Sequence, residues 1–90
     1  MKFKNLADLY HYFDQLAFDD VDADILFASS YIRGFVSLSA TEYGDDSQPL
    51  TKILAENVSE KMTEARTELS PQDREIVKNY WSELLPSFTE

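Results

Sequence analysis

The sequence contains no cysteine, only two glycines and only three prolines among its 90 residues. Without cysteine, the chain has no disulfide framework, no thiolate nucleophile and no zinc site that uses sulfur ligands. A β-sandwich or β-barrel needs a turn residue about every 8–12 positions, and so few glycines and prolines cannot supply them. The scarcity of helix-breaking residues therefore favours long helices joined by short connections.

Basic residues are also few, because eight lysines and arginines stand against seventeen aspartates and glutamates, for a net charge of −9. Binding to a phosphate backbone or to an anionic membrane surface depends on clustered positive charge. We therefore expect neither nucleic acid nor a membrane as a partner. The negative charge would attract a basic patch on another protein. The alternative interpretation is that the charge only keeps the protein soluble.

Long hydrophobic runs are absent, and the first residues, Met1 to Asp8, contain no long apolar stretch. A cytoplasmic location is therefore the expectation. Hydrophobic residues nevertheless make up 43% of the chain and aromatic residues 13%, which argues against disorder because a folded core needs apolar area. A chain of this length suits one domain, residues 1–90.

Four segments repeat apolar residues at spacings of three and four, the pattern of helices with one buried face. The sequence thus predicts an all-α four-helix bundle of up-down-up-down topology, with helices near residues 5–18, 22–43, 48–69 and 71–85. The second helix is apolar over nearly half of its circumference, so we expect it to contact two neighbours and to be the most buried. Gly34 lies in its interior, where close approach of another helix is the expected compensation for the cost of glycine.

Capping residues support these boundaries. Asn5 and Asp22 precede the first two helices, and Ser70 precedes a proline at the first position of the fourth. Gly44 suits the left-handed residue that ends the second helix, and Pro49 suits the first turn of the third.

Two blocks of sequence resemble a known family. One is the run FASSYIRGFVSL at 27–38, and the other is the run ELSPQDREIVKNYWSELL at 68–85. With the acidic pair Asp19-Asp20 between the first two helices, they are similar to the YfcL-like family of small bacterial proteins over most of the chain. The resemblance implies a small, cytoplasmic, helical protein. Because the function of that family is unknown, the resemblance brings no catalytic residues.

The candidate binding residues lie on the second predicted helix: Arg33, Ser30, Ser37 and Tyr31. Arg33 shares a face with the two serines and follows Tyr31 by two positions. An arginine beside small polar side chains can pair with a carboxylate or phosphate of a partner. The alternative is an internal ion pair with an aspartate of the 19–24 turn or of a neighbouring helix, which the surplus of acidic residues favours.

The acidic turn Asp19–Asp24 places three aspartates at alternate positions, as at the start of a calcium-binding loop. A complete EF-hand loop needs a glycine at its sixth position and a glutamate at its twelfth. This chain has Ile25 and Tyr31 there, so the motif fails. A solvated turn that caps a helix is the expectation, and weak binding of a divalent ion is the alternative.

Other residues with chemical potential have structural interpretations. His11 is the single histidine and has no recognisable nucleophile or ligand partner. Tyr80 and Trp81 could stack on a ligand, but Trp81 continues the apolar stripe of the fourth helix, which favours core packing. No phosphate-binding loop, catalytic triad or metal motif occurs. We therefore expect no enzyme activity, no cofactor and no bound metal.

The expected function is that of a non-enzymatic, acidic, helical protein-interaction module. Its expected partner is a basic protein or a second copy of the chain in a homodimer. An exposed patch is expected among apolar residues that the helical stripes do not need: Phe3, Tyr12, Phe18, Leu26 and Phe88. The alternative function is a small-ligand or divalent-metal binding domain that uses Arg33 or the Asp19–Asp24 turn.

Overall fold

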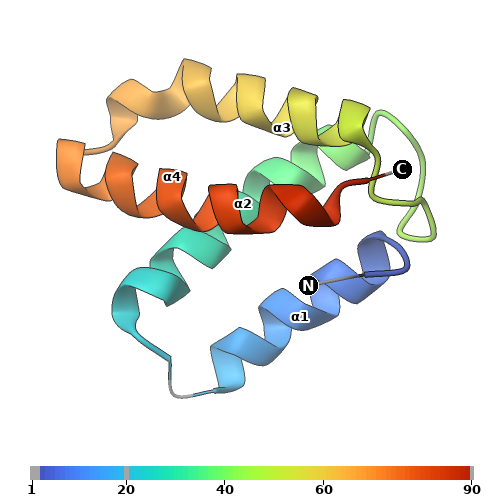
Figure 1. Cartoon of the computed structure of the whole chain (residues 1–90), viewed down its shortest axis with the longest axis horizontal. Helices are drawn as coiled ribbons and strands as arrows, with labels where there is room; N and C mark the ends of the chain where they lie inside the picture. The colour runs from blue at the N-terminus through green and yellow to red at the C-terminus, as the bar shows by residue number, and fades with distance from the viewer. Residues whose placement is uncertain (1–2, 20, 90) are drawn as a thin grey trace.

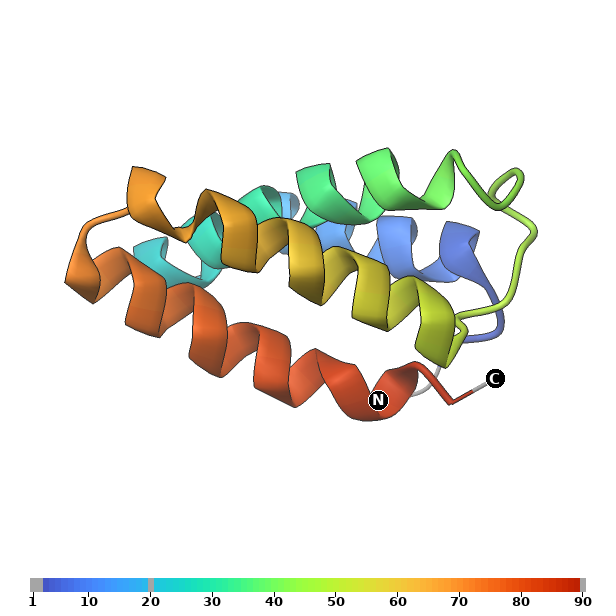
Figure 2. The ribbon, with the colours of Figure 1, turned by 90° about the horizontal axis from the view of Figure 1, so that it is seen from above.

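The computed structural model describes residues 3–19 and 21–89. Four α-helices occur in that part of the chain: α1 (Leu6–Phe18), α2 (Ala23–Ala40), α3 (Lys52–Ala65) and α4 (Pro71–Leu84). Two short 3₁₀ helices, η1 (Arg66–Glu68) and η2 (Leu85–Ser87), extend α3 and α4. Successive helices run in alternating directions (Figures 1 and 2). With no strand among the described residues, the predicted all-α four-helix fold is confirmed.

Helix α2 is the central element of the bundle. It packs against α1, α3 and α4, and in the view of Figure 1 it passes behind α4. Ala28, Ile32 and Val36 project from it at helical spacing and are fully buried. The prediction that this helix is the most buried is therefore supported, and it contacts three neighbours rather than two.

One hydrophobic core joins all four helices. Trp81, predicted to pack in the core, is only 6% exposed, and its ring lies 5.4 Å from that of Phe88. The buried apolar side chains come from every helix and from the segments that follow α2 and α4: Leu6, Leu9, Phe13, Ala28, Ile32, Val36, Ala40, Leu50, Leu54, Ala55, Val58, Val77, Trp81, Leu84 and Phe88.

The connection between α2 and α3 is held against the start of α1. The Leu6 amide donates a 2.9 Å hydrogen bond to the Gln48 carbonyl, and the Ala7 amide donates one of the same length to the Asp46 carbonyl. Amides in the first turn of a helix have no acceptor within that helix. Carbonyls from a distant loop therefore complete the N-terminus of α1, in addition to the Asn5 cap.

This loop explains why two predicted boundaries differ from the structure. Helix α2 ends at Ala40 instead of residue 43, and α3 begins at residue 52 instead of residue 48. Gly44 has the predicted positive φ, 137°, but lies in the loop beyond the helix end. Pro49 precedes α3 rather than standing in its first turn. The cap of α3 is Thr51, whose hydroxyl oxygen accepts a 3.0 Å hydrogen bond from the Leu54 amide.

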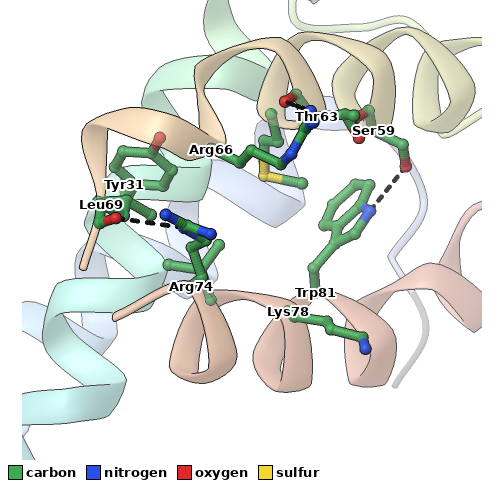
Figure 3. Close-up of a pocket in the computed structure, with 10 residues that line it drawn as sticks. Tyr31, Ser59, Thr63, Arg66, Leu69, Arg74, Lys78 and Trp81 are labelled. Atoms are coloured by element: carbon green, nitrogen blue, oxygen red, sulfur yellow. Dashed lines mark hydrogen bonds between the residues drawn. The ribbon is translucent and has the colours of Figure 1, made fainter. Parts of the chain in front are cut away.

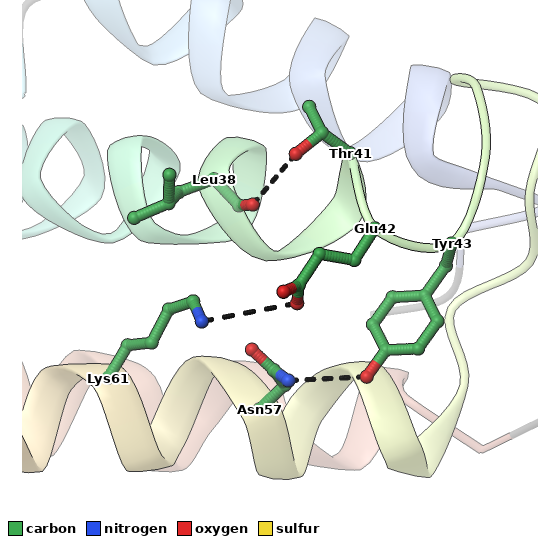
Figure 4. Close-up of polar contacts among 6 residues, drawn as sticks. All are labelled: Leu38, Thr41, Glu42, Tyr43, Asn57 and Lys61. Carbon is green, nitrogen blue, oxygen red and sulfur yellow. Dashed lines mark hydrogen bonds and ion pairs between the residues drawn. The ribbon is translucent and has the colours of Figure 1, made fainter.

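Polar side chains fasten the segment after α2 to α3 (Figure 4). The Lys61 ammonium lies 4.0 Å from a Glu42 carboxylate oxygen, and the Asn57 amide donates a 3.2 Å hydrogen bond to the Tyr43 hydroxyl. These contacts are at least partly exposed to solvent and add little stability.

Gly34 does not mark a close contact between helices. The residue is exposed, and a Cβ atom added to it would meet no other atom within 4 Å. The expectation that another helix approaches closely at this glycine is therefore wrong, because Gly34 lies on the solvent side of α2.

Replacing Gly34 with alanine is expected to raise the free energy of unfolding by about 0.5–1 kcal/mol, since alanine loses less backbone entropy in a helix and meets no obstacle here. Gly44→Ala is the control and should lower stability, because the φ of 137° at that position strains an alanine. Urea denaturation followed by circular dichroism measures both changes. A less stable Gly34→Ala protein would contradict the open environment of this position.

Candidate functional site

Arg33 is tied to α1. Its Nε lies 3.3 Å from Asp14 Oδ1, and its guanidinium carbon lies 4.7 Å from the centre of the Tyr10 ring. Both partners belong to α1, so an ion pair and a cation–π contact join α2 to its neighbour. The two charged side chains are 40% and 59% exposed, so solvent screens the pair. This arrangement is the internal ion pair that the sequence left open as the alternative for Arg33.

The four candidate residues on α2 do not form one site. Ser30 is exposed and Ser37 is half-buried, and no hydrogen bond joins either hydroxyl to Arg33 in the described residues. Tyr31 lies on a different face, where it lines a groove next to α3 and α4. The structure thus separates Tyr31 from Arg33.

This groove, between α3 and α4, holds a cavity of about 280 Å³ (Figure 3). Tyr31 lies at one end of it, and Trp81 lies toward the other. The Trp81 Nε1 donates a 2.8 Å hydrogen bond to Ser59 Oγ and so bridges the two helices. The lining combines apolar and basic side chains: Tyr31, Ser59, Met62, Thr63, Arg66, Leu69, Arg74, Val77, Lys78 and Trp81.

Three of the eight basic residues line this groove, and no carboxylate does. Arg66 Nη1 donates a 2.7 Å hydrogen bond to the Thr63 carbonyl, and Arg74 Nε donates a 3.2 Å hydrogen bond to the Leu69 carbonyl. Neither arginine forms an ion pair within residues 3–19 and 21–89. This cluster was not predicted from the sequence. The only local signal was the spacing of Arg74 and Lys78, which places them on one face of a helix.

The Tyr31 hydroxyl is a polar group without a partner in the groove. It is shielded from solvent and forms no hydrogen bond within the described structure. Burial raises the pKa of Tyr31 above its usual value, and the negative charge of Glu68 raises it further. The hydroxyl therefore keeps its proton at neutral pH.

A second cavity, also of about 280 Å³, lies on the other side of α4, against the start of α2. It contains two carboxylates, those of Asp24 and Glu83, and no lysine or arginine. The buried Tyr80 hydroxyl borders it, close to the Tyr12 hydroxyl. Burial raises the pKa of Tyr80, and the nearby Tyr12 hydroxyl and Glu83 carboxylate raise it further. The lining consists of Asp24, Ile25, Ala28, Ile76, Asn79, Tyr80 and Glu83.

The turn between α1 and α2 exposes large apolar side chains among carboxylates. Phe18 is 87% exposed, and Ile25 and Leu26 are 38% and 40% exposed. We define the acidic tip as these three residues together with three described aspartates of the turn, Asp19, Asp22 and Asp24. Asp20, the remaining acidic residue of the predicted turn, lies outside the described residues.

The tip contains two of the five apolar residues that the helical stripes left over. Phe18 and Leu26 are exposed, whereas Phe88 is buried in the core, and Phe3 and Tyr12 pack against it. Ile25 belongs to both the tip and the acidic cavity beside α4. Asp24 is likewise shared, so the tip adjoins that cavity.

A known protein family matches nearly the whole chain. The family model described as YfcL protein matches residues 4–86, from the segment before α1 into η2. The chain belongs to the YfcL family. Neither the curated proteins nor the solved structures provide a match.

The resemblance in the two sequence blocks of this YfcL-family protein is thereby confirmed. The first block, 27–38, forms most of α2, and the second, 68–85, forms α4 together with its capping residue. Within the described residues, no helix combines the length and apolar character needed to cross a membrane. No three acidic or histidine side chains in that part of the chain are grouped to hold a metal ion.

Proposed function

We propose that this YfcL-family protein is a non-enzymatic protein-interaction module whose contact face is the acidic tip. The observation behind the proposal is Phe18, a phenylalanine at the end of α1 that is 87% exposed, while Ile25 and Leu26 are exposed at the start of α2, across the same turn. Apolar area in contact with water is unfavourable by about 25 cal/mol for each Å². Burial of Phe18 against a partner would recover that free energy, and exposed apolar surface in a small protein often marks such a contact.

The charges around Phe18 indicate a basic partner. Asp19, Asp22 and Asp24 form no ion pair within the described residues, and Glu83 adds a fourth carboxylate across the adjoining cavity. A segment that presents apolar and basic side chains together, such as a basic amphipathic helix, matches this surface in both respects. A symmetric dimer through the tip fits less well, because it would bring the same carboxylates of two copies together.

Affinity capture from the native host tests the proposal, with three forms of the immobilised protein: wild type, Phe18→Ser/Leu26→Ser, and the control Leu38→Ser/Ile53→Ser. The control removes two side chains that are 59% and 63% exposed on α2 and α3. We expect a basic partner on the wild type and the control, and about tenfold less on the tip variant, as for the loss of an apolar anchor. High salt should weaken the capture because the contact is partly electrostatic.

The captured partner is then purified and its affinity for the three forms is measured by calorimetry. Equal affinity for the wild type and the tip variant would contradict the proposal. Loss of binding in the Leu38→Ser/Ile53→Ser control alone would place the contact face at the junction of α2 and α3 instead. Capture of no partner at low salt would also count against an interaction module.

A further inference from the structure

We propose that the groove between α3 and α4 binds a small organic anion, a carboxylate on an aromatic or aliphatic body, at a site separate from the acidic tip. The geometry behind this proposal is a cavity with basic side chains at its edge and apolar side chains along its wall (Figure 3). Helix α4 separates this groove from the acidic cavity, so the two sides of one helix present opposite charge.

The basic side chains of the groove are available to a ligand. A guanidinium has five N–H donors, and Arg66 and Arg74 each use one of them on a backbone carbonyl. These two hydrogen bonds hold the guanidinium groups in place and leave the other donors free. Because a guanidinium matches a carboxylate in shape and can bind it through two parallel hydrogen bonds, a carboxylate is the fitting anion.

The absence of acidic residues from the lining matters in a chain with a net charge of −9. Three basic residues line this groove, although they lie on η1 and on two successive turns of α4. Glu68 acts on the Tyr31 hydroxyl from nearby but is not part of the lining. The groove is therefore a local positive region on a negative protein, the arrangement that would admit an anion.

The apolar wall and the size of the groove indicate what the body of the carboxylate ligand must be: apolar and small. Met62, Val77 and Trp81 provide apolar contact area, and the Tyr31 side chain closes one end of the groove. A volume of about 280 Å³ is near the lower limit of about 300 Å³ for small-molecule pockets. A helix of a partner protein is about 10 Å across. It would not fit between α3 and α4, since the Trp81–Ser59 hydrogen bond already joins these two helices.

Trp81 is the single tryptophan of the chain, so its fluorescence reports on the groove directly. We would titrate the protein with phenylacetate and octanoate, and with the uncharged phenylacetamide and octanamide. The carboxylates are expected to change the Trp81 emission saturably, and the amides to bind about tenfold more weakly because they lack the charge that pairs with arginine. The indole N–H signal in NMR spectra gives a second readout of the same side chain.

Two matched variants test the roles of the arginines. Arg66→Gln/Arg74→Gln is expected to weaken the binding of phenylacetate by about tenfold or more. Lys4→Gln/Lys52→Gln removes the same amount of charge outside the groove and should change the affinity by less than about twofold. Thermal unfolding confirms that both variants are folded.

Four results would overturn the proposal: no saturable change at millimolar carboxylate, equal affinity for the amides, equal weakening in the lysine control, or unchanged affinity in the arginine variant. The Phe18→Ser/Leu26→Ser variant should bind phenylacetate as the wild type does. The groove proposal and the tip proposal can therefore fail independently.

Discussion

Replacing Ile32 with alanine is expected to lower the free energy of unfolding by about 2–5 kcal/mol, the range for truncating a large aliphatic side chain in a core. Ile32 has no exposed surface, and α2 packs against the three other helices. The lost methyl and methylene groups would leave a space that fixed helices on several sides cannot fill. Because a domain of this size has a total stability of about 5–15 kcal/mol, the loss would be a large fraction of it.

Leu38→Ala on the same helix is the matched control for Ile32→Ala. Leu38 is 59% exposed, so its truncation should change stability by no more than about 0.5 kcal/mol. Urea denaturation followed by circular dichroism gives both values. Similar losses in the two variants would contradict the central position of α2.

Replacing Trp81 with alanine is expected to cost about 3–5 kcal/mol of stability, as for other large aromatic residues in a core. Trp81 is 6% exposed, contacts the Phe88 ring and donates its indole N–H across the groove to Ser59. Helices α3 and α4 are separated by the groove along this stretch, so the side chain provides much of the connection between them. Its removal should therefore loosen the α3–α4 pair.

Two smaller changes separate the contributions of Trp81. Trp81→Phe keeps an aromatic ring in the core but removes the indole N–H. Ser59→Ala keeps the indole ring but leaves its half-buried N–H donor without an acceptor, at a cost of about 1–3 kcal/mol. Denaturation followed by circular dichroism suits all three variants, since it does not depend on tryptophan emission. A loss below about 1 kcal/mol in Trp81→Ala would place the side chain outside the core and contradict the structure.

The helices of this fold could be predicted from the sequence because their signals are local. Apolar spacing and capping residues such as Asn5, Asp22 and Ser70 place the helix starts of α1, α2 and α4 within one residue of the structure. Two of the wrong boundaries surround the loop whose carbonyls complete the start of α1. The third is the end of α3, which lies at Ala65 instead of residue 69, where the chain continues as η1. The contact between that loop and α1 joins segments about forty residues apart in the chain, and no local pattern contains it.

The residues of the two proposed binding surfaces were predictable to different degrees. Phe18 and Leu26 were identified because they fall outside the helical stripes, and both are exposed. The groove could not be predicted, since Arg66 and Arg74 come together with Tyr31 only after α3 and α4 fold back over α2. The sequence left two interpretations of Arg33, a contact with a partner or an internal ion pair. The structure decides between them because α1 places Asp14 beside Arg33.

An NMR titration is the direct test of whether the acidic tip is a contact face for a segment with basic and apolar side chains. The ¹⁵N-labelled protein is titrated with a peptide that has lysines on one helical face and leucines on the other, and with a second peptide in which serines replace the leucines. We expect saturable shifts of the backbone amides around Phe18, Asp24 and Leu26 with the first peptide, and much weaker shifts with the second. The Phe18→Ser/Leu26→Ser variant should lose the response. Equal shifts from both peptides, or shifts centred on another face of the bundle, would contradict the account.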